Sequence, residues 1–207
     1  MNKNFDNNGF KYVDLDLPSG TLWATCNVGA DKPSDFGLYF QWGDTQGCSI
    51  DQIGIERGQK KFSWNDYKFN PSGDRETFTK YTNSGASLEL EDDAAHVNMG
   101  GDWHMPTPTQ IRELINETDN TWTTQDGVNG RLFTSKKNDK SIFIPAAGVV
   151  WHSSLYDSGD YGYVWSSMSS AGGVYGGQYL CFLSGSAYLN YGNYNRYYGF
   201  SVRGVIG

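Results

Sequence analysis

Hydrophobic and polar residues first form a clear pattern between Lys11 and Ala24. Its first half alternates with a period of two, which is typical of a half-buried β-strand. A Pro-Ser-Gly turn at residues 18–20 separates it from a short apolar run, which predicts a second strand. Residues 1–10 are polar and rich in asparagine, so we expect a flexible lead-in before a single domain over residues 11–207.

The middle of the chain predicts a first helix over Glu89–Met99. The segment opens with a cluster of acids, and negative charge in a first turn complements the helix dipole. Leu90, Ala94 and Val97 are spaced to share one face of this helix.

A second helix is predicted from Thr107 onward. Thr107 suits the N-cap, Pro108 suits the first helical position, and Gln110 completes a capping box. An apolar stripe for packing then follows at Ile111, Leu114 and Ile115.

The rest of the pattern consists of short strands and turns. Phe36–Gly43 is an aromatic segment with the character of a buried strand, whereas residues 44–86 are polar and irregular, which indicates a long surface excursion. Beyond Asn120, two strand-like runs flank a Gly/Asn-rich turn, and residues 141–148 read as a buried strand closed by proline and glycine. Two helices among many short strands predict an α+β fold with a mainly antiparallel sheet.

Composition supports an ordered, loop-rich protein. Aromatic residues make up 15% of the 207 residues, and there are 26 glycines. Disordered segments lack aromatics, so this composition favours a packed fold with many turns over a disordered chain.

The charge of the chain excludes several classes of partner. A net charge of −7 provides no general attraction to phosphate backbones, so we expect no nucleic-acid partner. No apolar run reaches membrane-spanning length, so we expect no membrane insertion. The first residues contain no apolar segment of the secretory type. The protein then acts in the cytoplasm, or it reaches a virion, such as a phage tail, or a cell surface by another route, or the sequence is trimmed at its start.

The composition changes sharply in the C-terminal quarter. Ten of the 14 tyrosines lie after residue 150, and between Tyr161 and Arg203 the only charged residues are two arginines. Serine, glycine and asparagine fill most of the gaps. Tyrosine offers a large contact area at low entropic cost, and the small polar residues supply adaptable hydrogen bonds, so the mixture is typical of a recognition surface.

The same segment has an unusual coding signature. From Ser169 to Arg203, every residue except Gln178 belongs to the set encoded by codons that end in a pyrimidine. Lysine and glutamate, which are common elsewhere in proteins, are absent from it. The pattern fits a stretch in which asparagine-type codons were randomised at adenines.

Four segments, taken in order, resemble a known family. They are Val13–Ala30, Tyr39–Gly43, Gly101–Thr107 and Gly199–Arg203. Over about residues 11–204 the chain resembles the formylglycine-generating-enzyme branch of the C-type lectin fold, in a form common in gut bacteria. Within that branch its C-terminal end is similar to the variable proteins of diversity-generating retroelements. In these proteins, adenine-directed reverse transcription diversifies a C-terminal ligand-binding segment, here about residues 165–203.

The resemblance implies a division of labour within this segment. Scaffold positions would be Trp165, Ser166, Ser167, Leu180, Phe182, Arg196, Gly199, Phe200, Val202 and Arg203. Ligand-binding positions would be Tyr175, Tyr179, Cys181, Leu183, Ser186, Tyr188, Asn190, Tyr191, Asn193, Tyr194, Asn195, Tyr197 and Tyr198. Alternation through residues 179–183 independently places Leu180 and Phe182 on one side and the odd positions on the other, outward side.

We therefore expect a receptor-binding, adhesin-type protein that is not an enzyme. Its partner would be a protein or glycan on a cell surface. The chain could act as a homo-oligomer, in which several weak sites bind together, but its sequence leaves the oligomeric state open. The alternatives are an oxidoreductase of the formylglycine-generating kind and a structural surface or virion subunit. The oxidoreductase requires a C-terminal cysteine pair, and only Cys181 lies there. We expect no cofactor and no metal, because the acids of residues 89–93 are explained by the helix dipole.

Overall fold

The strand–turn–strand pattern at the start of the chain forms part of a four-stranded sheet. β2 (Phe10–Asp14) pairs antiparallel with β3 (Leu22–Asn27), as expected, and β3 pairs antiparallel with the C-terminal strand β14 (Arg203–Ile206). In this computed structural model, which describes residues 5–53, 61–75 and 77–207, β1 (Phe5–Asn7) extends the sheet beyond β2. Residues 5–7 of the expected lead-in thus form a strand, and residues 1–4 lie outside the described residues.

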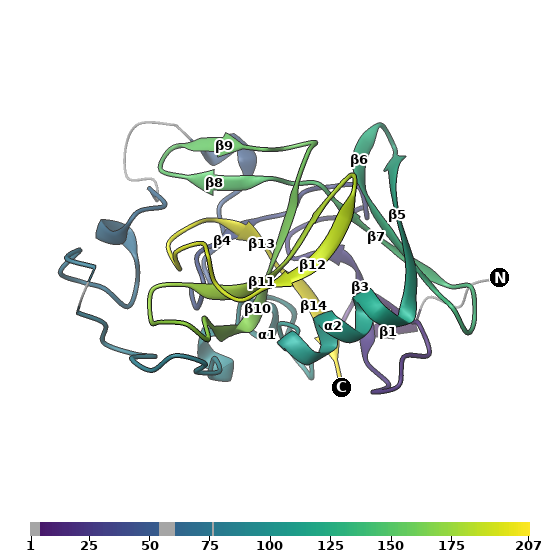
Figure 1. Cartoon of the computed structure of the whole chain (residues 1–207), viewed down its shortest axis with the longest axis horizontal. Helices are drawn as coiled ribbons and strands as arrows, with labels where there is room; N and C mark the ends of the chain where they lie inside the picture. Colours follow the sequence, from purple (N-terminus) through teal and green to yellow (C-terminus); the bar gives the residue numbers. More distant parts are fainter. Residues whose placement is uncertain (1–4, 54–60, 76) are drawn as a thin grey trace.

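A five-stranded sheet occupies the centre of the molecule (Figure 1). Its strands, in spatial order, are β12 (Ser186–Asn190), β11 (Gly177–Leu183), β10 (Gly162–Ser169), β13 (Phe200–Ser201) and β4 (Tyr39–Phe40). All neighbours are antiparallel except β10 and β13. The C-terminal segment thus supplies most of the central sheet, while β4 closes one edge.

Two smaller sheets complete the β structure. One contains three strands, β5 (Thr118–Gln125), β6 (Val128–Ser135) and β7 (Ser141–Pro145). The other is a hairpin of β8 (Val149–Trp151) and β9 (Ser154–Tyr156). Both are antiparallel. The predicted α+β class with mainly antiparallel sheets is therefore confirmed.

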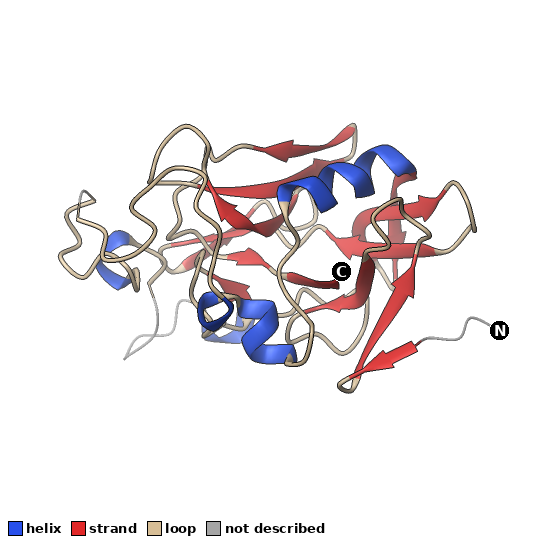
Figure 2. Cartoon of the chain, turned by 90° about the horizontal axis from the view of Figure 1, so that it is seen from below, coloured by secondary structure: helices blue, strands red, loops and turns tan. Residues whose placement is uncertain are grey.

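The second predicted helix forms as its sequence signals require. In α2 (Pro108–Glu117) the Thr107 hydroxyl accepts from the Gln110 backbone N–H at 3.2 Å, and the Gln110 side chain accepts from the Thr107 N–H at 2.8 Å. Ile111 and Leu114 are fully buried. The helix lies against β12 and β5 (Figures 1 and 2).

The first predicted helix is shorter than expected. A 3-10 turn at Leu90–Asp92 precedes α1 (Ala94–Met99), and Asp93 is the N-cap, accepting from the His96 N–H at 2.9 Å. Leu90 and Val97 are exposed, so the proposed apolar face of the first helix is wrong. The helix instead buries Ala94, Ala95 and Met99, and it lies against β14.

The central sheet separates two hydrophobic cores. One core is largely aromatic and includes Trp42, Trp165 and Phe200. The other is largely aliphatic and includes Leu114 and Leu180. Because both faces of the central sheet are covered, its strands contain few exposed side chains.

The long excursion after β4 contributes to the core, which its polar composition did not suggest. Phe62, Tyr67, Phe69 and Tyr81 are all buried, and the last three belong to the aromatic core. A 3-10 turn at Trp64–Asp66 presents Trp64 edge-on to Tyr67 at 5.6 Å. The irregular segment is therefore anchored by its aromatics, although most of its polar residues remain at the surface.

Arg203 joins three strands from inside the protein. Its guanidinium donates to the Ala24 carbonyl and the Asn27 side-chain oxygen on β3, both at 2.9 Å, and to the Phe143 carbonyl on β7 at 3.0 Å. The side chain is fully buried, and burial lowers its pKa to about 10, which still leaves it charged at neutral pH. One side chain thus links β14 to its neighbour β3 and to β7 of a different sheet.

Replacing Arg203 is expected to destabilise the protein strongly. Arg203→Ala leaves three buried acceptors unsatisfied and opens a cavity, so the free energy of unfolding should fall by about 3–5 kcal/mol. Arg203→Lys should also be destabilised, because one ammonium cannot replace the planar donor set. Chemical denaturation provides the measurement. The exposed Arg112→Ala is the control and should change stability by no more than about 0.5 kcal/mol.

Candidate functional site

The strand register gathers tyrosines on one face of the central sheet. Cys181 of β11 lies opposite Tyr163 of β10 and Tyr188 of β12. Tyr179, two residues away on the same face, lies opposite Asn190. Because side chains alternate along each strand, these positions project to the same side. The opposite side presents Leu180 and Phe182 to the aliphatic core, so the predicted alternation is confirmed.

A surface hollow of about 420 Å³, which we call the first hollow, lies over this tyrosine-bearing face. It is lined by Asp157, Tyr161, Tyr163, Tyr179, Cys181, Tyr188, Asn190, Asn193 and Tyr194. Tyr194 comes from the loop after β12 and contacts Tyr163 edge-on, with ring centroids 5.5 Å apart. Asp157 comes from the turn after β9, and its Oδ2 accepts from the Tyr163 hydroxyl at 3.4 Å. Three separate segments therefore build one cavity.

Three phenol groups of the first hollow, those of Tyr163, Tyr179 and Tyr188, are held in their neutral form. Burial raises the pKa of Tyr163 and of Tyr179. A hydrogen bond with the Cys181 thiol, together with burial, raises the pKa of Tyr188 to about 12. At neutral pH these phenols can donate and accept hydrogen bonds but carry no charge.

Cys181 has the environment of an inert thiol. It is buried, and burial raises its pKa above the ordinary value. Since the thiolate is the nucleophile and the metal ligand, a raised pKa lowers its reactivity. No disulfide joins Cys26, Cys48 and Cys181, all of which lie in the described part of the chain.

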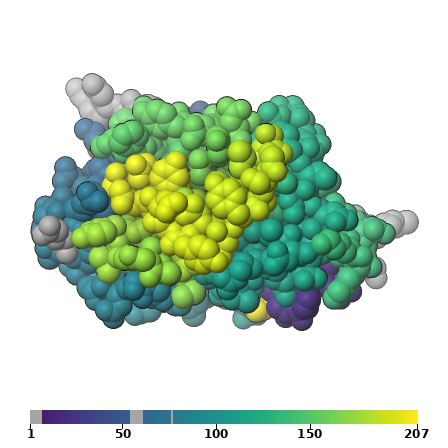
Figure 3. All heavy atoms as spheres, viewed as in Figure 1, coloured from purple at the N-terminus to yellow at the C-terminus, as the bar shows by residue number. Residues whose placement is uncertain are grey.

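A second hollow of about 310 Å³ adjoins the first and shares Asn193 with it. Its lining is rich in glycine and comes from the loop between β10 and β11 and the loop after β12. Tyr175 and Tyr191, both exposed, stand at its border. The two hollows together form a continuous surface, which we call the tyrosine groove. Figure 3 shows the C-terminal residues, in yellow, gathered in the middle of this face.

The two loops beneath the second hollow touch through glycines. A Cβ built on Gly176 would lie 2.3 Å from the Gly192 carbonyl oxygen, and a Cβ on Gly192 would lie 2.3 Å from the Cβ of Ser170. Gly192 also has a φ of 119°, which only glycine adopts readily. Glycine is therefore required for this close approach.

The structure distributes the expected ligand-binding residues over three environments. Tyr175, Ser186, Tyr188, Tyr191 and Asn193 are exposed; Leu183, Asn190, Tyr194, Asn195 and Tyr198 are half-buried; and Tyr179, Cys181 and Tyr197 are buried. The expectation that the odd positions of β11 face outward is thus wrong for Tyr179 and Cys181. Their sheet face is covered by Tyr194 and Phe200, which contact Tyr179 at centroid distances of 5.8 and 5.0 Å.

Not every expected position belongs to the tyrosine groove. Leu183 and Ser186 lie at the β11–β12 turn and line neither hollow. Tyr197 stacks on Tyr198 at 4.7 Å, and Tyr198 in turn contacts Trp151 at 6.1 Å, again outside the two hollows. Asn195 also lines neither hollow, and the ligand-binding roles of all thirteen expected residues stay predictions.

Several lining residues were missing from the expected set. Tyr161, Tyr163 and Asp157 line the first hollow but precede the segment that resembles a variable region. The tyrosines belong to the same C-terminal enrichment, which was the available signal. Nothing in the sequence indicated that Asp157 would line the first hollow, because only the packing of the β8–β9 hairpin brings it there.

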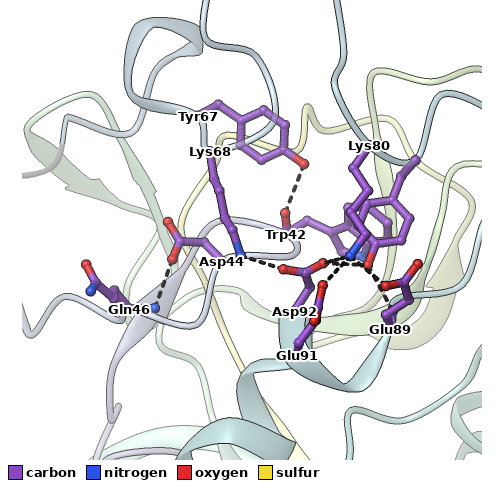
Figure 4. Close-up of polar contacts among 10 residues, drawn as sticks. Trp42, Asp44, Gln46, Tyr67, Lys68, Lys80, Glu89, Glu91 and Asp92 are labelled. Atoms are coloured by element: carbon purple, nitrogen blue, oxygen red, sulfur yellow. Dashed lines mark hydrogen bonds and ion pairs between the residues drawn. The ribbon is translucent and has the colours of Figure 1, made fainter.

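An acidic cluster lies elsewhere in the molecule, around the 3-10 turn before α1 (Figure 4). Carboxylate oxygens of Glu89, Glu91 and Asp92 approach one another closely enough to hold a cation. Lys80 already occupies their centre, with its Nζ 2.7, 2.9 and 2.5 Å from the three carboxylates. The cluster is therefore explained as an ion-pair network.

Asp92 is the buried member of this network. Burial alone would raise its pKa, but hydrogen bonds from Lys68, Lys80 and Tyr81 outweigh burial and lower it below the ordinary value of 3.8. The network connects the excursion, which carries Lys68, Lys80 and Tyr81, to the start of α1.

The lowered pKa predicts a pH-dependent contribution to stability. A carboxyl with a lower pKa in the folded than in the unfolded state stabilises above the unfolded value, here near pH 3.8, and loses this effect as pH falls through the folded pKa. Asp92→Asn should destabilise by about 1–3 kcal/mol at pH 7, and the difference from wild type should shrink below pH 4. Urea unfolding at pH 7, 5 and 3 measures it.

The matched control for Asp92→Asn is Glu91→Gln, which removes an exposed carboxylate of the same cluster. It should have little effect at any pH. A stability difference between Asp92→Asn and wild type that stays constant down to pH 3 would contradict the assignment.

Comparison with family models, curated proteins and solved structures gives no match. The fold class and the tyrosine groove therefore rest on the chain itself. Within the described residues, no helix is long and apolar enough to cross a membrane.

Proposed function

We propose that this chain is a ligand-binding protein of the receptor-binding or adhesin type, with the tyrosine groove as its recognition surface. The fold would be the formylglycine-generating-enzyme-like form of the C-type lectin fold, and a diversity-generating retroelement would vary the groove. The function would be binding, without a chemical step.

The single observation that carries the proposal is the tyrosine groove itself. Two adjoining hollows are lined almost entirely by tyrosine, glycine, serine and asparagine, and most of the lining comes from the C-terminal quarter. Tyr175, Tyr188 and Tyr191 are 38%, 42% and 54% exposed there, which is unusual for large aromatics. Exposed tyrosines on a well-packed scaffold are suited to anchoring a ligand.

The expected scaffold residues support the same proposal by their burial. Trp165, Phe200 and Arg203 are each 0% exposed. The indole N–H of Trp165 donates to the Phe40 carbonyl at 2.8 Å, which ties the segment to β4. Rigid support beneath an exposed loop surface lowers the entropic cost of binding.

The oxidoreductase alternative has less support. Cysteine-based oxidation requires a reactive thiolate, whereas the Cys181 thiol is buried with a raised pKa. Cys26 belongs to β3, and the backbone of Cys48 forms an isolated antiparallel β-bridge with Tyr39 of β4. Neither cysteine lines the tyrosine groove.

Diversification predicts a specific arrangement in the genome that carries the gene. A reverse-transcriptase gene should lie nearby, together with a template repeat that matches the coding sequence of about residues 165–203. Differences should fall at adenines of the template. A repeat with differences at other bases, or no repeat, would contradict the retroelement while leaving the tyrosine groove as a fixed binding site.

Removing the exposed tyrosines should abolish binding without unfolding the protein. The triple variant Tyr175→Ala, Tyr188→Ala and Tyr191→Ala should lose at least tenfold in binding, because aromatic anchors dominate interface energies. Labelled protein can be measured on intact cells of a panel of gut bacterial strains by flow cytometry. The melting temperature should change little, since all three side chains are exposed.

The matched control is a variant with three exposed apolar residues replaced outside the groove: Phe10→Ala, Leu90→Ala and Val97→Ala. It should bind like wild type. Wild-type binding by the tyrosine variant would overturn the proposed function.

A further inference from the structure

Charge is distributed unevenly along the tyrosine groove. In the first hollow, Asp157 is the only charged residue of the lining. The second hollow is flanked by two arginines. The Arg75 guanidinium lies over the Tyr175 ring at 5.2 Å, and Arg112 donates to the Tyr191 hydroxyl at 3.5 Å. The groove is therefore acidic at one end and basic at the other.

The first hollow offers the groups that bind an ammonium ion. Five of its nine lining residues are tyrosines, and aromatic rings attract cations; Tyr161, Tyr188 and Tyr194 are the three that are not buried. The Asp157 carboxylate, an exposed group, accepts only a long hydrogen bond of 3.4 Å from Tyr163, so acceptor capacity remains. Neutral phenol oxygens add further acceptors without repelling a positive charge.

We propose that the first hollow binds the primary ammonium group of a lysine side chain on a protein ligand. The assignment rests on the proposed function, whose ligand it specifies. Charge complementarity supports it: the Asp157 carboxylate lines the first hollow, whereas Arg75 and Arg112 contact two tyrosines of the second hollow. Those arginines repel a cation from the second hollow, so the lysine is directed to the first.

Other ligand chemistries fit the first hollow less well. A phosphate or carboxylate would be repelled by Asp157. A quaternary ammonium has no N–H and leaves the carboxylate and phenol oxygens without a donor. A neutral sugar could stack on tyrosines and donate a hydroxyl hydrogen bond to the carboxylate, but it carries no positive charge to pair with it.

The test is an NMR titration of the isotope-labelled protein with Nα-acetyl-lysine methylamide. Saturable shifts are expected at Tyr163, Tyr179, Tyr188 and Tyr194. The norleucine analogue, which lacks the ammonium, should bind at least fivefold more weakly. Choline is the comparison ligand that carries a quaternary ammonium, and it should also bind more weakly than the lysine amide.

Two single variants test whether the Asp157 carboxylate is the charge that binds the ammonium group. Asp157→Asn should weaken binding of the lysine amide at least fivefold, which is the size expected for one partly exposed ion pair. Asparagine tolerates the φ of 59° at this position, so folding should be retained. Asp160→Asn removes an exposed charge three residues away that does not line the hollow, and it should bind like wild type.

Three results would each overturn the assignment. The first is that the lysine amide does not bind at all; the second is that the norleucine analogue or choline binds as tightly as the lysine amide; the third is that Asp157→Asn binds the lysine amide as tightly as wild type does. The cell-binding assay separates the two proposals. If Asp157→Asn binds cells normally while the tyrosine variant does not, the lysine assignment fails and the proposed function stands. If the tyrosine variant binds cells normally, the proposed function fails.

Discussion

Two buried guanidinium groups hold the C-terminal segment in place. A buried charge is stabilised by the hydrogen-bond acceptors and aromatic ring faces around it, so the chain that supplies them has little freedom. Arg203 takes its acceptors from β3 and β7. Arg196 donates to the Tyr81 carbonyl at 2.9 Å and lies over the Trp42 ring at 4.7 Å. Each arginine therefore connects the segment to parts of the chain far away in sequence.

Arg196 matters most for the tyrosine groove. Its backbone N–H donates to the Tyr175 carbonyl at 2.8 Å, and its carbonyl accepts from the Trp42 N–H at 2.8 Å. The two loops of the second hollow are thus fixed to the aromatic core through one residue. Exposed tyrosines can occupy these loops because the backbone beneath them is held by buried contacts.

Local signals in the sequence were sufficient for local structure. The capping box at Thr107 and Gln110 depends only on neighbours, and α2 forms as predicted. Alternation along β11 also survives, because side-chain direction in a strand is a property of the backbone. What alternation could not reveal was that both faces of β11 are covered. That depends on Tyr194 and Phe200 and on the excursion, whose aromatics were hidden among polar residues.

The tyrosine groove was predictable only in part for the same reason. The enrichment in tyrosine and glycine located the surface, and Tyr188, Tyr191 and Asn193 do lie on it. Asp157 reaches the first hollow through the placement of a hairpin, which is a long-range event. The polarity of the groove likewise depends on Arg75 and Arg112, which come from the excursion and from α2.

The contact between Gly176 and Gly192 has a consequence for how such a surface could evolve. Glycine codons that end in a pyrimidine contain no adenine, so if the template of the proposed retroelement also carries such codons at these two positions, a process that alters adenines leaves both glycines unchanged. Asparagine and tyrosine codons do contain adenine, and these residues surround the contact. Base substitution also preserves loop length. Side-chain chemistry in the groove could therefore vary widely while the crossing of its two loops is inherited intact.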